Sequence, residues 1–238
     1  MASATGIPEN PPPAPETEPL LGRPGDASQK EGSGLQYNFF IGTATVAQAG
    51  IWILTALVWS AIFMNDLILF SAHPLLNSAG ILLLVQGILV LQPTHTPKQK
   101  TVGTNIHFAI NFTGFLALIA GLIVIEVNKG NHARFTSIHG RIGLVTYILI
   151  VIQTLIGFAQ YYIPTSVFGS VDNGKKIYKY HRISGYLILL MALATICAAT
   201  ETGFNKMALH IQLWAVIVAS VLVVAGVAPR IKKAKLGF

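Results

Sequence analysis

The sequence predicts an all-α, polytopic membrane protein with six transmembrane helices. Hydrophobic residues make up 53% of the chain and charged residues only 11%, which leaves too little polar surface for an ordinary water-soluble domain. Apolar runs of about 20 residues are long enough to cross a hydrocarbon layer of about 30 Å as helices. Helices are favoured because lipid offers the backbone no hydrogen-bond partners. The predicted membrane segments cover residues 41–62, 67–91, 104–127, 137–161, 181–201 and 208–228.

These segments form one predicted membrane domain, residues 37–230, between two polar tails. Residues 1–36 are rich in Pro, Glu, Gly and Ser and contain few large apolar side chains. Such a segment cannot bury enough surface to offset the entropy of ordering, which predicts a disordered cytosolic tail. Residues 231–238 form a short basic tail, also expected in the cytosol.

The first tail contains a candidate sorting signal. Glu16, Leu20 and Leu21 have the spacing of the acidic di-leucine signals that sorting adaptors bind on cytosolic tails. We therefore expect the protein in a vacuolar or endosomal membrane rather than in the plasma membrane.

Basic residues set the predicted orientation. A net charge of +7 would also suit a nucleic-acid partner, but the positive-inside rule explains how the Lys and Arg residues are distributed. With a cytosolic N-terminus, twelve of them fall on the cytosolic side: Arg23, Lys30, Lys98, Lys100, Lys175, Lys176, Lys179, Arg182, Arg230, Lys232, Lys233 and Lys235. Four fall on the other side: Lys129, Arg134, Arg141 and Lys206. Both termini are therefore expected in the cytosol, and no nucleic-acid partner is expected.

The four middle segments each carry one histidine near the start. These histidines are His73, His107, His139 and His181. The first two are followed by asparagine at the fourth position and glycine at the seventh, and the last two by glycine at the fourth. Residues with these spacings share one helix face, so we interpret the glycines as leaving room for a flat ligand. Bulky residues at Gly143 or Gly185 should then disturb ligand binding more than the same change at Gly121.

The predicted topology sorts the histidines into two pairs. Segments 67–91 and 137–161 run from the outer side to the cytosol, which places His73 and His139 at the same outer depth. The two other segments run the opposite way. His107 and His181 are therefore expected together near the cytosolic side. Ionisable residues inside a membrane are costly and usually functional, although a single histidine can also be a hydrogen-bonded packing residue.

Two histidines at each level suit an iron with two axial imidazoles, because a porphyrin supplies the other four nitrogens. Zinc takes three or four protein ligands, and no Asp, Glu or Cys is expected beside either pair. Without a Cys-x-x-Cys-His motif, the haem would be non-covalent. The alternative is a haem-free histidine-containing transporter or a structural membrane protein. Transport pathways normally need carboxylates inside the membrane, whereas Asp66, Glu126 and Glu201 are expected near its outer boundary.

Over residues 41–228 this histidine pattern resembles that of the cytochrome b561 family, which are six-helix membrane reductases with two haems. The resemblance implies two haem b groups held by helices two to five. Their irons would have His73 with His139, and His107 with His181, as axial ligands. It also implies transmembrane electron transfer from cytosolic ascorbate to monodehydroascorbate or ferric chelates. The protein would then be an ascorbate-dependent oxidoreductase in the lipid bilayer, with a second copy of the chain as a possible homodimer partner.

The resemblance also suggests which side chains contact haem and substrate. Arg141 and Arg182 lie one or two positions from predicted ligands and are candidates for pairing with haem propionates. His132 is expected to border the outer site. Basic residues near the cytosolic haem could hold ascorbate, and the candidates are Lys98, Lys100, Lys175 and Lys176. The alternative is that these lysines only enforce topology.

Overall fold

The structure is a computed structural model in which residues 27–232 and 236 are described. The candidate sorting signal at Glu16, Leu20 and Leu21 lies outside the described residues. So does most of the C-terminal basic tail, residues 233–235 and 237–238.

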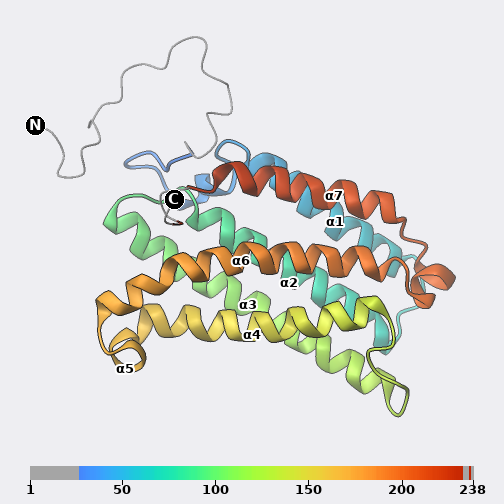
Figure 1. Ribbon diagram of the computed structural model, residues 1–238. Helices are drawn as coiled ribbons and strands as arrows, with labels where there is room; N and C mark the ends of the chain where they lie inside the picture. Colours follow the sequence, from blue (N-terminus) through green and yellow to red (C-terminus); the bar gives the residue numbers. More distant parts are fainter. Residues whose placement is uncertain (1–26, 233–235, 237–238) are drawn as a thin grey trace, which may run out of the picture.

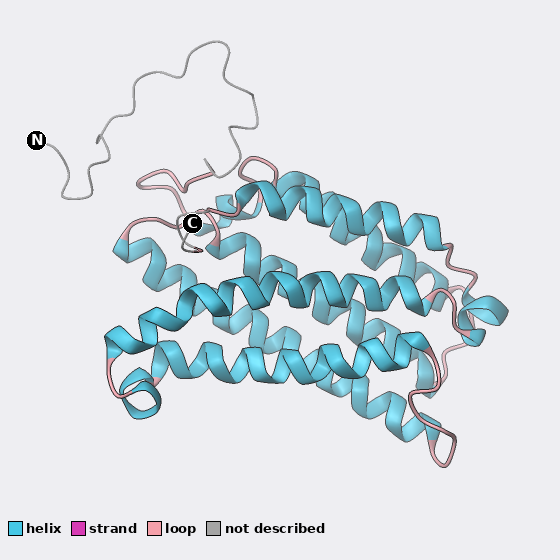
Figure 2. Cartoon of the chain, viewed as in Figure 1, coloured by secondary structure: helices cyan, strands magenta, loops and turns pink. Residues whose placement is uncertain are grey.

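The described chain is a bundle of helices without strands (Figure 2). The long helices are α1 (Ala44–Phe63), α2 (Ala72–Leu91), α3 (Pro97–Lys129), α4 (Ile138–Tyr162), α6 (Val171–Ala199) and α7 (Leu213–Val227). Each forms, alone or with the short turn beside it, a span long and apolar enough to cross a membrane. Three pairs of helices pack most closely, α2 with α3, α4 with α6, and α1 with α7 (Figure 1). The predicted all-α, six-span membrane fold is confirmed.

Two of the helices begin well before the apolar runs that predicted them. Helix α3 begins at Pro97 rather than at residue 104, because the Thr96 hydroxyl accepts a hydrogen bond (3.2 Å) from the backbone N–H of Gln99. Proline fits the first turn of a helix, where its missing N–H is not needed. Hydropathy registers only the part of the helix that lies in lipid.

The segment 164–180, which we predicted to be a loop, is mostly helical. It contains the short helix α5 (Pro164–Phe168) and the beginning of α6. The Ser170 hydroxyl caps α6 by accepting a hydrogen bond (3.1 Å) from the N–H of Asn173. Helix α6 therefore carries the basic cluster on a rigid extension of the transmembrane helix.

Arg230 holds the chain together at one end of the bundle. Its side chain is buried and donates hydrogen bonds to the carbonyls of Asn38 (3.2 Å), Leu89 (3.1 Å) and Ile41, and to the side-chain oxygen of Gln92 (2.9 Å). The Leu89 carbonyl belongs to the last turn of α2, where the helix dipole favours a positive charge. The guanidinium thus joins the N-terminal segment, α2 and the end of α7. We call this end of the bundle the Arg230 end.

Residues 27–36, which we predicted to be part of a disordered tail, are described and packed at the Arg230 end. Gln29 is buried, and its backbone N–H donates to the Pro93 carbonyl at 3.1 Å. Its side-chain oxygen accepts a hydrogen bond (3.1 Å) from Asn38. These hydrogen bonds pair polar groups that the composition had led us to expect in solvent. The packed part of the chain therefore begins before residue 37.

Candidate functional site

His73 and His139 face each other at the end of the bundle opposite Arg230. Their ring centroids lie 6.2 Å apart, and the ring planes are inclined by 84°. Two imidazoles that flank one metal atom through bonds of about 2 Å have centroids about 6 Å apart. Helices α2 and α4 therefore bring this predicted pair to a separation that suits a shared metal.

Backbone carbonyls orient both of these rings. Nδ1 of His73 lies 2.9 Å from the carbonyl oxygen of Gly121, and Nδ1 of His139 lies 2.9 Å from that of Thr195. A carbonyl only accepts, so each Nδ1 donates its proton and the lone pair lies on Nε2. This is the tautomer that a metal ligand requires, and the hydrogen bond also raises ligand basicity.

His107 and His181 line one cavity at the Arg230 end. The cavity has a volume of about 630 Å³ and lies among α2, α3, α4 and α6. This volume lies within the range of about 300–1,000 Å³ that is typical of ligand and cofactor sites. Nδ1 of His107 lies 2.7 Å from the carbonyl oxygen of Gly87, which fixes the same tautomer as in the other pair. The second predicted pair is thus also brought together.

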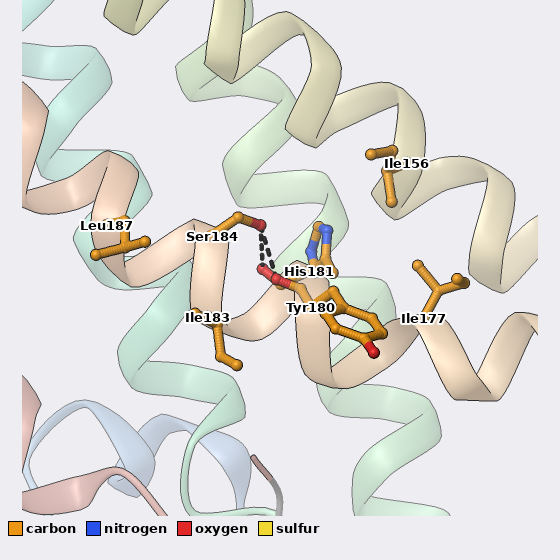
Figure 3. Close-up of a pocket in the computed structure, with 7 residues that line it drawn as sticks. All are labelled: Ile156, Ile177, Tyr180, His181, Ile183, Ser184 and Leu187. Carbon is orange, nitrogen blue, oxygen red and sulfur yellow. Dashed lines mark hydrogen bonds between the residues drawn. The ribbon is translucent and has the colours of Figure 1, made fainter. Parts of the chain in front are cut away.

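His181 differs from the other three histidines in its surroundings. Its Nδ1 is buried and has no hydrogen-bond partner, while its carbonyl accepts a hydrogen bond (2.6 Å) from the side-chain amide of Gln153. The Ser184 hydroxyl donates to the other end of that amide at 2.7 Å. Figure 3 shows the smaller apolar cavity, of about 290 Å³, beside His181. His181 therefore lines both cavities.

These residues fit a haem at each pair. No group of three or more His, Cys, Asp or Glu side chains that could hold a metal ion occurs in the part of the chain that the structure describes. Two imidazoles alone do not complete the coordination of iron, and the remaining positions suit the four nitrogens of a porphyrin. The orphaned Nδ1 of His181 and the orphaned Oδ1 of Asn111, both buried at the larger cavity, also indicate a site built around a further group.

The predicted substrate lysines divide into two groups. Lys100 and Lys175 line the larger cavity together with Arg182. Lys98 and Lys176 are exposed on the same end of the bundle but are not among the residues that line this cavity. The rotation of α3 and α6 thus separates neighbouring lysines that look equivalent in the sequence.

The basic residues that we predicted on the outer side lie in or next to the loop between α3 and α4. Arg141 is exposed, and its Nε donates to the carbonyl of Phe135 at 3.1 Å. Phe135 adopts a positive φ of 54°, which this hydrogen bond helps to hold. His132 is exposed in the same loop. Arg141 therefore orders the loop beside His139, a role that we did not predict.

The interpretation of the glycines at the seventh position after histidine was wrong. A Cβ at Gly80 would lie 3.0 Å from the carbonyl oxygen of Gly114, and a Cβ at Gly114 would lie 3.0 Å from the carbonyl oxygen of Gly80. These two glycines let α2 and α3 cross closely, as small residues do between transmembrane helices. Gly121 is no neutral reference either, because a Cβ there would lie 2.5 Å from Asn77, whereas the nearest contact at Gly143 is an ordinary 3.5 Å.

Several residues of the site were not found by sequence reasoning, among them Gly87, Gly121, Thr195 and Gln153. One signal for them exists. In both α2 and α3 the histidine repeat continues to a second glycine, fourteen residues after the histidine. The carbonyl groups themselves carry no side-chain signature, so only the packing of the helices reveals what they contact.

The chain is similar to known proteins along most of the membrane bundle. The model of the family described as eukaryotic cytochrome b561 matches residues 72–210, more than half of the chain. The chain is 28% identical over 163 residues to ascorbate-specific transmembrane electron transporter 2 of Zea mays, a match that covers 62% of this chain and 64% of that protein. It is 22% identical over 161 residues to the transmembrane ascorbate-dependent reductase CYB561 of Homo sapiens, covering 67% of this chain and 62% of the relative. The chain thus spans less than two thirds of the length of these relatives. The chain belongs to the eukaryotic cytochrome b561 family, and this membership implies an integral membrane protein that binds haem b.

Proposed function

We propose that this protein carries electrons across a membrane through two haem b groups. The observation that carries the proposal is the presence of two histidine pairs, one toward each end of the bundle. His73 and His139 would hold one haem, and His107 and His181 the other. When bound, haem supplies an iron that takes up and releases one electron. The protein would act as a transmembrane oxidoreductase.

The protein's own residues prepare these sites in two ways. Backbone carbonyls hold three of the four histidines in the tautomer that has its lone pair on Nε2. In His107 the Nδ2 of Asn111 lies 3.0 Å from that atom. Apolar side chains of α2, α3 and α4, such as Leu84, Phe108 and Ile150, line part of the larger cavity. An apolar, preorganised surrounding strengthens the electrostatic contacts inside it and stabilises a single arrangement of the ligands.

Ascorbate is the proposed electron donor, entering at the Arg230 end. Ascorbate is an anion at neutral pH, and the cavity that contains His107 and His181 is lined by basic side chains: Lys100, Lys175, Arg182, Arg230 and Lys232. Such a surface steers an anion toward the nearby haem. The positive-inside rule places this end in the cytosol, and the names of the relatives support ascorbate as donor.

The proposed acceptor is monodehydroascorbate or a ferric chelate at the opposite end. Arg134 and His132 in the loop before α4, and Arg141 in the first turn of α4, are all exposed near His139, which favours an anionic acceptor. Arg134 forms an ion pair (2.5 Å) with Glu126, so Arg141 and His132 are the better candidates for contacting it. The di-leucine spacing in the N-terminal tail supports an endosomal or vacuolar membrane as the location.

The test is to purify the full chain in detergent and reconstitute it in vesicles of known orientation. The expected result is a reducible b-type absorption spectrum with two haems per chain, and faster reduction when ascorbate is added on the cytosolic face. A correctly folded but colourless preparation would overturn the proposal. One haem per chain would show that only one histidine pair is a haem site. Equal reduction from both faces would contradict directional entry at the Arg230 end.

A further inference from the structure

The histidines of α2 and α3 are anchored crosswise. Gly87 follows His73 by fourteen residues on α2, and Gly121 follows His107 by fourteen on α3. The structure exchanges these partners, because Nδ1 of His73 contacts the Gly121 carbonyl at 2.9 Å and Nδ1 of His107 contacts the Gly87 carbonyl at 2.7 Å. Each helix therefore provides the ligand of one site and the backbone anchor of the other.

A side chain at position 121 would displace Asn77, which packs beside His73. A Cβ at Gly121 would lie 2.5 Å from Nδ2 of Asn77 and 3.2 Å from its Cγ. Asn77 follows His73 by one helical turn, and its Nδ2 lies 2.8 Å from the His73 carbonyl and 3.2 Å from His73 Nδ1. The bare Cα of Gly121 thus leaves space for the amide beside the histidine that its carbonyl anchors.

The same arrangement recurs around His107. A Cβ at Gly87 would meet the side-chain amide of Asn111, with 2.6 Å to its Cγ and 2.9 Å to its Nδ2. The Nδ2 of Asn111 lies 3.2 Å from Nδ1 and 3.0 Å from Nε2 of His107. Two sites with different depths in the bundle are therefore built from one local design of histidine, asparagine and glycine.

The two anchors lie on either side of a single helix crossing. Gly80 and Gly114, where α2 and α3 approach most closely, each lie seven residues after the histidine and seven before the anchoring glycine of their own helix. The helix pair is therefore related by an approximate twofold axis through this crossing. At each end of the pair, a glycine carbonyl of one helix therefore contacts the histidine of the other helix.

The pair formed by α4 and α6 follows this design on one side only. Thr195 follows His181 by fourteen residues, and its carbonyl anchors His139 of the partner helix. Gln153 follows His139 by fourteen residues, but it contacts His181 through its side-chain amide, which donates to the His181 carbonyl. The same offset of fourteen residues thus recurs in a second helix pair. In this pair the Nδ1 of His181 has no hydrogen-bond partner.

We propose that Gly87 and Gly121 are positioning residues that act across the helix pair. Gly87 on α2 sets the orientation and basicity of His107, and Gly121 on α3 does the same for His73. The inference rests on the proposed function, in which these histidines bind haem. Hydrogen-bond partners of ligating histidines typically contribute about 10- to 100-fold to the affinity of the bound group. Each glycine therefore affects the haem at its own end of the bundle, where the histidine ligand belongs to the partner helix.

The test compares the same substitution on the two helices when a single haem remains. In a His73→Ala chain, which keeps the His107 and His181 haem, Gly87→Ala should speed haem transfer to a scavenging apoprotein by about 10- to 100-fold. It should also shift the low-spin electron paramagnetic resonance signal of that haem. Gly121→Ala in the same chain should change neither. In a His107→Ala chain the two glycine variants should exchange their effects.

Two further variants separate anchoring from helix packing. Gly114→Ala crowds the α2 backbone without touching a histidine. It should therefore affect the remaining haem to the same extent in the His73→Ala chain and in the His107→Ala chain. Asn111→Ala removes the amide that a Cβ at Gly87 would meet, so the double variant Gly87→Ala with Asn111→Ala should regain most of the lost haem retention. Asn111→Ala alone is the reference for this double variant, because Nδ2 of Asn111 also lies 3.2 Å from Nδ1 and 3.0 Å from Nε2 of His107.

Equal effects of Gly87→Ala and Gly121→Ala on the same remaining haem would overturn the inference and would reduce both residues to helix packing. So would a double variant that releases haem as fast as Gly87→Ala alone. A different result identifies failure of the proposed function itself. If His73→Ala keeps two haems per chain, His73 is not a ligand, whatever the glycine variants do.

Discussion

The hydroxyl of Tyr147 on α4 donates a hydrogen bond to Oδ1 of Asn77 on α2. Asn77 in turn donates from Nδ2 to the carbonyl of His73 at 2.8 Å. A buried chain of hydrogen bonds therefore connects the two helices that carry His73 and His139. In a membrane such a chain limits relative rotation of the helices, which keeps the two imidazoles opposed.

Tyr147→Phe should loosen the site at His73 and His139 selectively. The substitution keeps the ring but removes the donor, and interhelical hydrogen bonds in membranes are worth about 0.6 kcal/mol on average. This energy corresponds to a roughly threefold faster release of the haem at this site, which is the result that we expect. The haem at His107 and His181 should be unaffected. Tyr186→Phe, which removes a hydroxyl that accepts a hydrogen bond (3.1 Å) from Gln92 at the Arg230 end, is the matched control.

Haem stoichiometry should follow the histidine pairs. His107→Ala and His181→Ala are each expected to remove the same haem, and His73→Ala and His139→Ala the other, because a single imidazole leaves one axial position open. The measurement is haem per chain, with an optical spectrum of each variant. His95→Ala, a change in the exposed turn before α3, should retain two haems per chain. Loss of the same haem in His73→Ala and His107→Ala would contradict the pairing.

Two of the four candidate lysines should control the rate of reduction by ascorbate. Lys100→Gln with Lys175→Gln removes charge from the wall of the larger cavity, whereas Lys98→Gln with Lys176→Gln removes the same charge from the surface outside it. The first pair should slow reduction several-fold and flatten its dependence on ionic strength, because attraction of a charged ligand is screened by salt. Stopped-flow reduction at several salt concentrations measures both effects.

The second pair of lysine substitutions is the control and should have a smaller effect at equal haem content. Equal slowing by both pairs would mean that the lysines act only through the net charge of this end of the protein. Unchanged rates in both would place the ascorbate site elsewhere.

Arg230→Met should destabilise the fold without altering the haem ligands. It leaves the buried carbonyls of Asn38 and Leu89 unpaired, and each unsatisfied polar group costs about 1–3 kcal/mol. A thermal unfolding midpoint several degrees lower is expected in nanodiscs, with two haems per chain in the folded fraction. Lys176→Met, at an exposed lysine that donates only to the side chain of Asn173, should leave the midpoint unchanged. An unaltered midpoint for Arg230→Met would show that the buried hydrogen bonds contribute nothing net.

The membrane fold and the histidine pairs could be predicted from the sequence because they depend on one-dimensional quantities. Apolar length sets the spans, and alternation of direction brings His73 to the depth of His139. The orientation, which charge bias predicts, stays a prediction. The same reasoning underestimated α6, because residues 171–180 form a helix outside the apolar run, where hydropathy gives no signal. It also left Gln29 in a tail that the structure shows packed against Pro93.

The tertiary structure alone decided which groups touch the histidines. Whether the carbonyl of Gly121 or that of a neighbouring residue reaches His73 depends on how α2 and α3 rotate and cross, and that is settled by close contact at Gly80 and Gly114. Rotation likewise places Lys100 in the cavity wall and leaves Lys98 outside it. Sequence spacing specifies a face of a helix, but the partner of that face is a property of the packed bundle, because the membrane-spanning part of each long helix is apolar on most of its circumference.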